Sequence, residues 1–229
     1  MFSKYPVADT ASLLADPARV SMLTALLDGE SRPAGELARI ADLSPQAASA
    51  HLAKLTEGRL LQCVREGRHH YYKMARPEVG VALEALAVVS PLPKAPITKE
   101  GEEIVALRFA RTCYDHLAGH LAVQLVDALV EKALLTRGAK EFRVTPEGSA
   151  FLASLRIEPA ALQRQRRLFA KPCLDWTERK HHVSGSLGAA LFSTFCRVGW
   201  LARRNGTRAV RLTDRGRAEF NKRFGLSLN

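Results

Sequence analysis

The chain has 229 residues, with 34 Lys and Arg against 23 Asp and Glu, so its formal net charge at pH 7 is +11. This excess is typical of a protein that binds polyanions such as nucleic acid, and the length predicts one large or two small domains. No apolar run reaches membrane-spanning length and residues 1–10 show no signal-peptide core, which excludes a membrane partner and favours a cytoplasmic location.

Residues 36–58 predict two helices joined by a tight turn. The first covers residues 36–41 and places Leu37 and Ile40 on one inner face. After the turn, Ser44 can cap free amides and Pro45 pre-sets a helical dihedral angle, so a second helix begins there and ends at Gly58. This pattern is a helix-turn-helix, in which the second helix lies in the DNA major groove.

The second helix has two contrasting faces. Ala48, Leu52 and Leu55 recur at helical spacing and form a stripe that we expect to be buried. His51 lies at the edge of this stripe and is interpreted as a half-buried packing residue. The opposite face is small and polar, which suits close approach to base edges. Our candidate DNA contacts on this helix are Ser44, Gln46, Ala47, Ser49, Ala50 and Lys54.

After Gly58 the apolar pattern changes from helical to alternating, which predicts a β-hairpin. Its strands cover residues 60–64 and 70–74, and residues 65–68 form the turn, where Gly67 can adopt a positive φ. Such a hairpin after a recognition helix is a wing. Arg65, Arg68 and His69 are the candidates to contact phosphates or the minor groove.

Residues 1–90 resemble the ArsR family of bacterial winged helix-turn-helix repressors. The resemblance is carried by Asp16-Pro17-Ala18-Arg19, Glu36-Leu37-Ala38, Leu43-Ser44, His51-Leu52-Ala53-Lys54-Leu55, and Arg65-Glu66-Gly67-Arg68 before Tyr71-Tyr72. It implies a homodimer that binds a double-stranded DNA operator as a repressor and is released by an effector. It also implies a dimer interface made by the helices at about residues 8–15 and 77–89.

The metal positions of that family are not matched here. Many members bind a soft metal through a cysteine pair in the helix before the turn, but residues 38–43 contain no cysteine. In the helix after the wing, Glu78 and Glu84 are isolated rather than part of a ligand cluster. If the protein senses an effector, it does so elsewhere.

The second half is separated by a proline-rich linker at residues 91–97 and contains a degenerate internal repeat. His116-Leu117-Ala118-Gly119 recurs as His182-Val183-Ser184-Gly185. We place the copies at about residues 113–155 and 179–224, each reading as a long helix, a short basic hairpin and a Thr-capped helix. The predicted fold is therefore mainly α with short β-hairpins: an N-terminal winged helix-turn-helix plus a C-terminal α+β domain, at 98–229, of two winged-helix-like repeats that serves sensing or oligomerisation.

The candidate effector site lies where the two copies begin. If residues 113–125 are helical, Cys113, His116 and His120 share one stripe and can hold zinc or another borderline metal, with Cys173 or His182 as a fourth ligand. Packing of a core histidine or cysteine, thiol or oxidant sensing, and a pocket for an apolar molecule beside Trp176 stay open as alternatives. No cofactor is expected to be needed for DNA binding; a metal ion or a small-molecule effector remains open.

The four cysteines are widely spaced and form no CxxC motif, which favours reduced thiols over a disulfide scaffold. The sequence lacks a glycine-rich phosphate loop, a GxSxG elbow and a paired-carboxylate motif, so we do not expect an enzyme. The prediction is a sequence-specific transcriptional regulator. The alternatives are an architectural or antitoxin-like DNA binder without an effector, and a metal- or thiol-responsive sensor that uses the C-terminal Cys and His residues.

Overall fold

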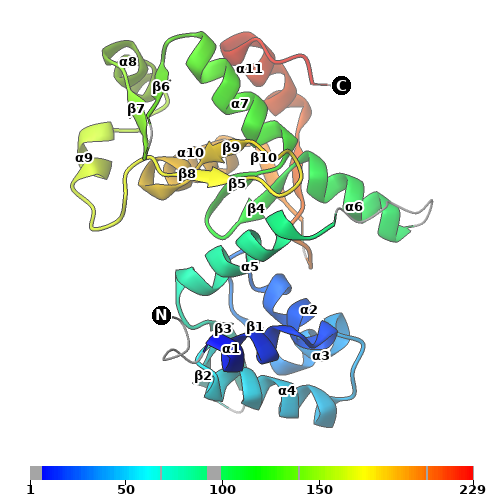
Figure 1. The fold of residues 1–229 in the computed structure, drawn as a ribbon. Coiled ribbons are helices and arrows are strands. Elements are labelled where there is room, and N and C mark those ends of the chain that lie inside the picture. Colours follow the sequence, from blue (N-terminus) through cyan, green and yellow to red (C-terminus); the bar gives the residue numbers. More distant parts are fainter. Residues whose placement is uncertain (1–6, 68, 92–98, 139, 205, 229) are drawn as a thin grey trace. The chain divides into compact units, whose positions relative to one another are not determined.

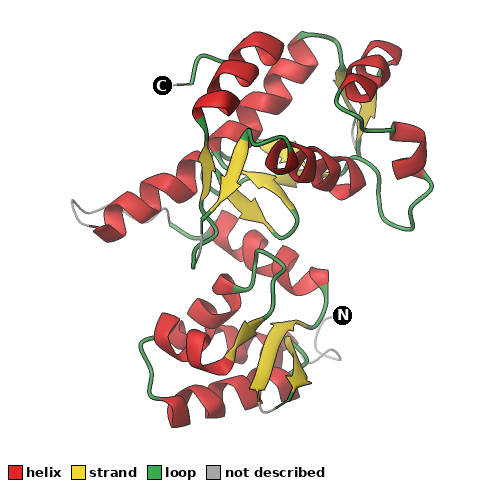
Figure 2. Ribbon diagram, turned by 180° about the vertical axis from the view of Figure 1, so that it is seen from behind, coloured by secondary structure: helices red, strands yellow, loops and turns green. Residues whose placement is uncertain are grey.

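The computed structural model describes residues 7–67, 69–91, 99–138, 140–204 and 206–228 (Figure 1). The chain divides into two compact units, one ending at Leu83 and the other beginning at Glu84. Helices predominate and the strands are short (Figure 2). Most of the expected linker, residues 92–97, lies outside the described residues, so the domain boundaries drawn from the sequence stay a prediction.

The first unit is a winged helix-turn-helix, as expected. Where the structure describes this unit, its three strands form one antiparallel sheet in the order β1-β3-β2. The helix expected at residues 36–41 begins earlier, at Ala34, because Pro33 is extended and stands at its N-cap. The elements are α1 (Val7–Leu14), α2 (Pro17–Ala25), β1 (Arg32–Pro33), α3 (Ala34–Ile40), α4 (Pro45–Glu57), β2 (Leu61–Glu66), β3 (His69–Met74) and α5 (Pro77–Val89), the last of which contains the division at Leu83.

A core of fully buried aliphatic side chains holds the helices of the first unit together. Leu37 of α3 and Leu52 and Leu55 of α4 are completely buried, together with Met22 and Leu23 of α2. Full burial of each such side chain stabilises the fold by about 1.5–3 kcal/mol. Ile40, expected on the inner face of α3, is only partly buried. The helical spacing of Leu52 and Leu55 therefore turns one face of α4 into the core and leaves the opposite face pointing outward.

The described residues of the second unit form four two-stranded antiparallel hairpins between helices. The order hairpin, helix, hairpin, helix occurs at residues 111–154 and again at 172–224. The elements are α6 (Lys99–Phe109), β4 (Arg111–Cys113), β5 (His116–Ala118), α7 (His120–Glu131), β6 (Leu135–Arg137), β7 (Phe142–Val144), α8 (Pro146–Ser154), α9 (Pro159–Gln163), β8 (Pro172–Leu174), β9 (His181–Val183), α10 (Gly185–Arg197), β10 (Leu201–Arg203), β11 (Val210–Leu212) and α11 (Asp214–Phe224).

The long helix expected from residue 113 onward is wrong. Residues 111–118 form the β4–β5 hairpin, and α7 begins only at His120. Tyr114 in the turn has φ of 60°, and Gly119 before the helix has φ of 90°, and neither value is helical. A Cβ on Gly119 would also lie 2.8 Å from the Arg108 carbonyl oxygen, so this position requires glycine. The hairpin changes which side chains Cys113 and His116 can meet.

The core of the second unit is built on α7, α10 and α11. Leu121 of α7 and Leu187 of α10 are completely buried. The ring of Phe195 stacks on Trp200 at a centroid distance of 5.2 Å and meets the edge of Phe220 at 5.2 Å. Among the described residues, no helix has both the length and the apolar character needed to cross a membrane.

Candidate nucleic-acid interface and cysteine–histidine cluster

Helix α4 has the bounds that the sequence predicts. Ser44 is extended, and its Oγ accepts a hydrogen bond from the Ala47 amide at 3.3 Å. Pro45 occupies the first helical position, and the Gly58 amide donates to the Lys54 carbonyl oxygen at 2.9 Å. The helix is thus closed at both ends by local bonds, which fixes its length and the positions of its outward side chains.

The two faces of α4 differ as expected. Ala48, Leu52 and Leu55 are buried, and His51 is half-buried with its Nδ1 3.7 Å from Asp16 Oδ1. The candidate contacts are exposed except for Ala47, which is half-buried; the exposed ones are Ser44, Gln46, Ser49, Ala50 and Lys54. The Ser49 hydroxyl donates to the Pro45 carbonyl oxygen at 2.8 Å, so its remaining hydrogen-bonding capacity is that of an acceptor.

The wing is a regular hairpin with a tighter turn than expected. Arg65 pairs with His70 and Glu66 with His69, so residues 65 and 66 belong to β2 rather than to the turn. Gly67 has φ of 61°, as its role in the turn requires. Arg65 and His69 are exposed near the tip. Arg68 lies outside the described residues, so its contact with DNA stays a prediction.

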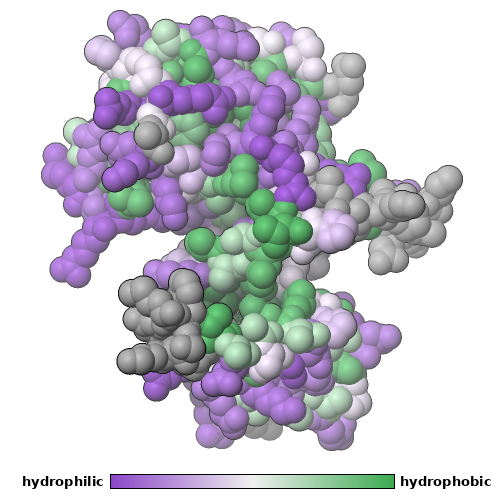
Figure 3. All heavy atoms as spheres, in the orientation of Figure 1, coloured by the Kyte–Doolittle hydropathy of each residue, from purple (hydrophilic) through white to green (hydrophobic). Residues whose placement is uncertain are grey.

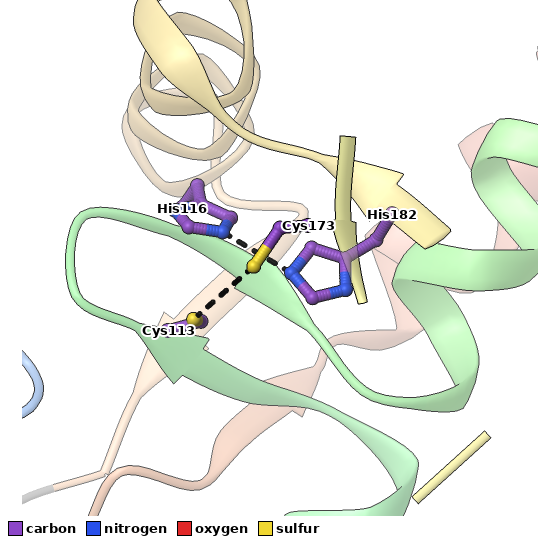
Figure 4. A group of neighbouring side chains, drawn as sticks. All are labelled: Cys113, His116, Cys173 and His182. Carbon is purple, nitrogen blue, oxygen red and sulfur yellow. Dashed lines mark hydrogen bonds between the residues drawn. The ribbon is translucent and has the colours of Figure 1, made fainter. Parts of the chain in front are cut away.

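A second group of reactive side chains gathers in the second unit (Figure 4). Cys113 lies directly opposite His116 in the β4–β5 hairpin, and Cys173 lies directly opposite His182 in the β8–β9 hairpin. Each hairpin therefore supplies one thiol and one imidazole, and we call these four residues the cysteine–histidine cluster. Their ligand atoms all lie within 4.8 Å of one another.

Contacts across the cluster join the two hairpins. Cys113 Sγ lies 4.0 Å from Cys173 Sγ, and His116 Nε2 lies 3.1 Å from His182 Nε2. Cys113, His116 and His182 are buried, and Cys173 is half-buried. The hydrogen bond with Cys173 and burial raise the pKa of the Cys113 thiol to about 12, while the same bond lowers the pKa of Cys173. The lowered thiol pKa that redox sensing requires is thus found at Cys173 and not at Cys113.

Each histidine of the cluster has a carboxylate beside its Nδ1 atom. His116 Nδ1 lies 3.4 Å from Asp115 Oδ1, and His182 Nδ1 lies 3.4 Å from Asp175 Oδ2. Although burial acts in the opposite direction, the contacts with His116 and Arg167 lower the pKa of Asp115 to about 2. For Asp175, His182 and Arg111 likewise outweigh burial and hold the pKa well below its usual range. Both carboxylates therefore stay negatively charged beside the imidazoles.

The same carboxylates also raise the histidine pKa values. Burial alone would lower the pKa of both imidazoles because it disfavours the charged form. Cys113 and Asp115 outweigh burial at His116, and Asp175 and Cys113 outweigh it at His182, so the pKa of each is raised. A proton on either imidazole is therefore favoured by its neighbouring carboxylate, although a charge on His182 acts against a charge on His116.

His120 and Trp176, the other two predicted effector residues, are not brought into the cluster. His120 begins α7, its side chain is 44% exposed, and its Nδ1 lies 2.9 Å from Glu178 Oε2. Trp176 covers the buried Arg111, whose guanidinium carbon lies 4.7 Å from the ring centroid. The predicted triad of Cys113, His116 and His120 relied on a helix that the structure replaces with a hairpin.

Sequence reasoning missed the residues that support the cluster. Arg111 is completely buried and donates to Asp175 Oδ2 at 3.0 Å, and the Gly119 amide donates to the same oxygen at 2.7 Å. Glu84, isolated in the sequence, is buried and accepts from Arg208 Nη1 at 2.7 Å. One signal was available, because Cys-x-Asp occurs at residues 113–115 and again at 173–175.

A family model described as a helix-turn-helix domain matches residues 14–64. Among solved structures, NolR from Sinorhizobium fredii is similar at 33% identity over 35% of this chain and 80% of its own, with a TM-score of 0.33. The homodimeric winged helix-turn-helix DNA-binding domain of Mb0332 from Mycobacterium bovis is similar at 30% identity over 36% of this chain and 76% of its own, also with a TM-score of 0.33. Both structures overlap with only about a third of the chain, so they do not establish its family. A match over nearly the full length does.

That match is a Bacillus subtilis (strain 168) protein named as the uncharacterized HTH-type transcriptional regulator YdfF. It is 43% identical over 222 residues, which cover 97% of this chain and 98% of the relative. The alignment thus includes both units, and the helix-turn-helix model falls on α2, α3 and α4. The chain therefore belongs to the HTH-type transcriptional regulators, which bind DNA.

Proposed function

We propose that the protein is a homodimeric repressor that binds an operator through α4 and the wing and is released when an effector binds. The observation that carries this proposal is the exposed face of α4. It presents Gln46, Ser49 and Ala50 without a bulky apolar side chain, and a wing with exposed Arg65 and His69 follows it in the same unit. Small outward side chains allow a helix to approach base edges in the major groove.

The roles of the individual side chains follow from their hydrogen-bonding capacity. The Gln46 amide both donates and accepts, so it can form a paired contact with adenine. Ser49, whose hydroxyl hydrogen is used by Pro45, can accept from the amino groups of cytosine or adenine. Lys54, Arg65, Arg68 and His69 supply positive charge or donors for phosphates, and Ala47 and Ala50 can contact a thymine methyl group.

Exposed apolar residues on α5 support a homodimer. Val81 is 55% exposed, Leu86 is 46% exposed and Val89 is 79% exposed, although other residues of this helix, Val79 and Leu83, are buried. Figure 3 shows hydrophobic side chains gathered over α5. A helix that is apolar on both its buried and its exposed side is typical of an interface with a second copy.

We assign the effector response to the second unit and propose that it consists of two related copies. Two matched features support this. Gly119, immediately before α7, and Gly185, the first residue of α10, both have positive φ at the start of the first helix of their copy. Thr145 and Thr213 both cap the second helix, accepting from Gly148 and Gly216 at 2.9 Å in each case.

Mobility shifts on the protein's own promoter region and on a scrambled duplex test the DNA-binding proposal. We expect Gln46→Ala and Ser49→Ala to lose discrimination, about 1–3 kcal/mol for each good contact removed. Ser154→Ala is the matched control, because Ser154 is also an exposed helical serine bonded to its own helix. Equal losses on both duplexes would reject Gln46 and Ser49 as base readers.

The dimer and the effector response need separate measurements. Val81→Lys places a charge on the exposed side of α5, and we expect it to lower the mass measured by light scattering from dimer to monomer. A monomeric wild-type protein would contradict the dimer. The effector response is tested in a reporter strain with a variant that lacks residues of the second unit. Loss of induction in a variant that still binds the operator would support effector release. Repression of the wild-type protein under every condition would contradict it.

A further inference from the structure

We propose that Cys113, His116, Cys173 and His182 bind one divalent metal ion of borderline softness, Zn²⁺, in a tetrahedral site that joins the β4–β5 and β8–β9 hairpins. The four residues come from two hairpins 60 residues apart, and each pair faces across its own hairpin. Their donor set is two sulfurs and two imidazole nitrogens, which favours zinc among the common divalent ions. This inference does not depend on DNA binding.

The distances fit a tetrahedron of this size. Usual zinc–sulfur and zinc–nitrogen bonds place two sulfurs about 3.8 Å apart and two nitrogens about 3.3–3.4 Å apart. The sulfur atoms here are 4.0 Å apart and the Nε2 atoms are 3.1 Å apart. The widest pair of ligand atoms is within 4.8 Å, so it closes by about 1.2 Å at most to reach a usual sulfur–nitrogen separation. Side-chain rotations are sufficient for such a change.

The contacts that both histidines make through Nδ1 also favour zinc. Each Nδ1 faces a carboxylate at 3.4 Å, Asp115 behind His116 and Asp175 behind His182. A negative charge beside Nδ1 favours the tautomer that carries its proton on that nitrogen and leaves Nε2 as the ligating atom, an arrangement that commonly orients zinc-bound histidine. The carboxylates are themselves held, Asp115 by Arg167 at 2.5 Å and Asp175 by Arg111 at 3.0 Å.

When both histidines carry their proton on Nδ1, the lone pairs of the two Nε2 atoms point toward each other. With both protons on Nδ1, this 3.1 Å contact is repulsive unless a cation or an extra proton lies between the rings. A proton moved to either Nε2 would make the contact a hydrogen bond, but it would leave that ring's Nδ1 lone pair facing a carboxylate. His182 is almost completely buried, and its Nδ1, despite facing Asp175, completes no hydrogen bond. A metal ion would bind both lone pairs and both sulfurs at once. The two thiols would release their protons to water, and the resulting thiolates would neutralise the charge of Zn²⁺.

The site offers four protein ligands, which is typical of zinc that holds a fold together rather than zinc that keeps a position open for a substrate. Because it bridges two hairpins of the second unit, zinc should stabilise that unit. At free zinc about 100 times its dissociation constant, we expect the melting temperature to rise by about 5–10 °C. Trp176 and Trp200 both belong to the second unit and report its unfolding.

The test titrates Co²⁺ and then Zn²⁺ into the full-length, reduced, chelator-treated protein. We expect one Co²⁺ per chain with the absorption of a tetrahedral thiolate complex, displaced by one equivalent of Zn²⁺. Cys173→Ser and His182→Gln should each weaken binding at least tenfold. Cys63→Ser removes an exposed thiol of β2, and His120→Gln removes the histidine that pairs with Glu178, so both controls should keep the wild-type spectrum.

A measurement on the wild-type protein guards against variants that fail to fold. Zn²⁺ should protect the half-buried Cys173 from alkylation, and a chelator should restore its reactivity, as mapped by mass spectrometry. Absence of a one-to-one cobalt complex, equal loss of the spectrum in Cys63→Ser, or a Cys113–Cys173 disulfide in protein kept under reducing conditions would each overturn the proposal.

Discussion

Replacing Gly216 by alanine provides a sharp test of how α11 is held in the second unit. A Cβ at this position would lie 2.0 Å from the Trp200 carbonyl oxygen, so the backbone must separate by at least about 1 Å to reach the closest distance seen for real Cβ atoms. That oxygen accepts hydrogen bonds from the Thr213 amide and the Thr213 hydroxyl, both at 3.1 Å. The substitution therefore displaces the start of α11 from β10.

The size of the effect follows from three contributions. Loss of two hydrogen bonds costs about 1 kcal/mol each, and forcing the backbone apart costs about 1–3 kcal/mol more. Alanine regains about 1 kcal/mol because it is the better helix former. The clash dominates, and the net loss of about 2–4 kcal/mol corresponds to a fall of about 10 °C in the melting temperature.

Tryptophan fluorescence during thermal unfolding is the appropriate assay, because both tryptophans, Trp176 and Trp200, lie in the second unit. Gly35→Ala is the matched control, monitored by far-UV circular dichroism. Gly35 lies in α3 with no atom within 4 Å of an added Cβ, so it should be neutral or stabilising by up to about 1 kcal/mol. A Gly216→Ala protein that melts within 2 °C of the wild type would show that this contact relaxes freely and would refute the reasoning.

Three further predictions use other contacts. Thr213→Ala removes the cap on the Gly216 amide and the bond to the Gly199 carbonyl oxygen, so it should lower the free energy of unfolding of the second unit by about 1–2 kcal/mol in urea. Thr213→Ser keeps the hydroxyl and should retain most of this stability. Equal losses in the two variants would show that the hydroxyl is not the cause. Leu52→Ala opens a cavity at a completely buried position of α4 and should cost about 2–5 kcal/mol by circular dichroism, a loss below 1 kcal/mol being inconsistent with this packing. Arg65→Ala should reduce the slope of log affinity against log salt by about 0.9 on operator and scrambled duplex alike, and a loss confined to the operator would mean that Arg65 reads a base.

Local sequence signals are sufficient to predict the recognition helix. Ser44 and Pro45 start it and Gly58 ends it, and all three act through bonds within one turn of the chain. The wing was predicted for the same reason, since alternation and Gly67 are local features. The short strand β1 was missed because its two residues, Arg32 and Pro33, carry no strand pattern and are defined only by pairing with β3.

The hairpin that carries Cys113 and His116 could not be predicted from local periodicity. The apolar and histidine residues of this segment are spaced as in a helix, but backbone contacts with residues far along the chain favour strands instead. The Thr112 amide, for example, donates to the Arg208 carbonyl oxygen at 2.9 Å. The candidate site shows the same limit. The sequence suggested four of its members among six, but only the folded chain shows that Cys173 and His182 are near and that His120 is not.

The composition of the three-stranded sheet has a consequence for how copies of the protein can associate. A strand at the edge of a sheet exposes amides and carbonyls that invite another chain to add as a further strand. Pro33 in β1 offers no amide hydrogen, and on the opposite edge β2 carries the exposed charges of Arg65 and Glu66. Both borders thus resist growth of the sheet, so aggregation by strand addition is disfavoured even in concentrated solutions of the protein.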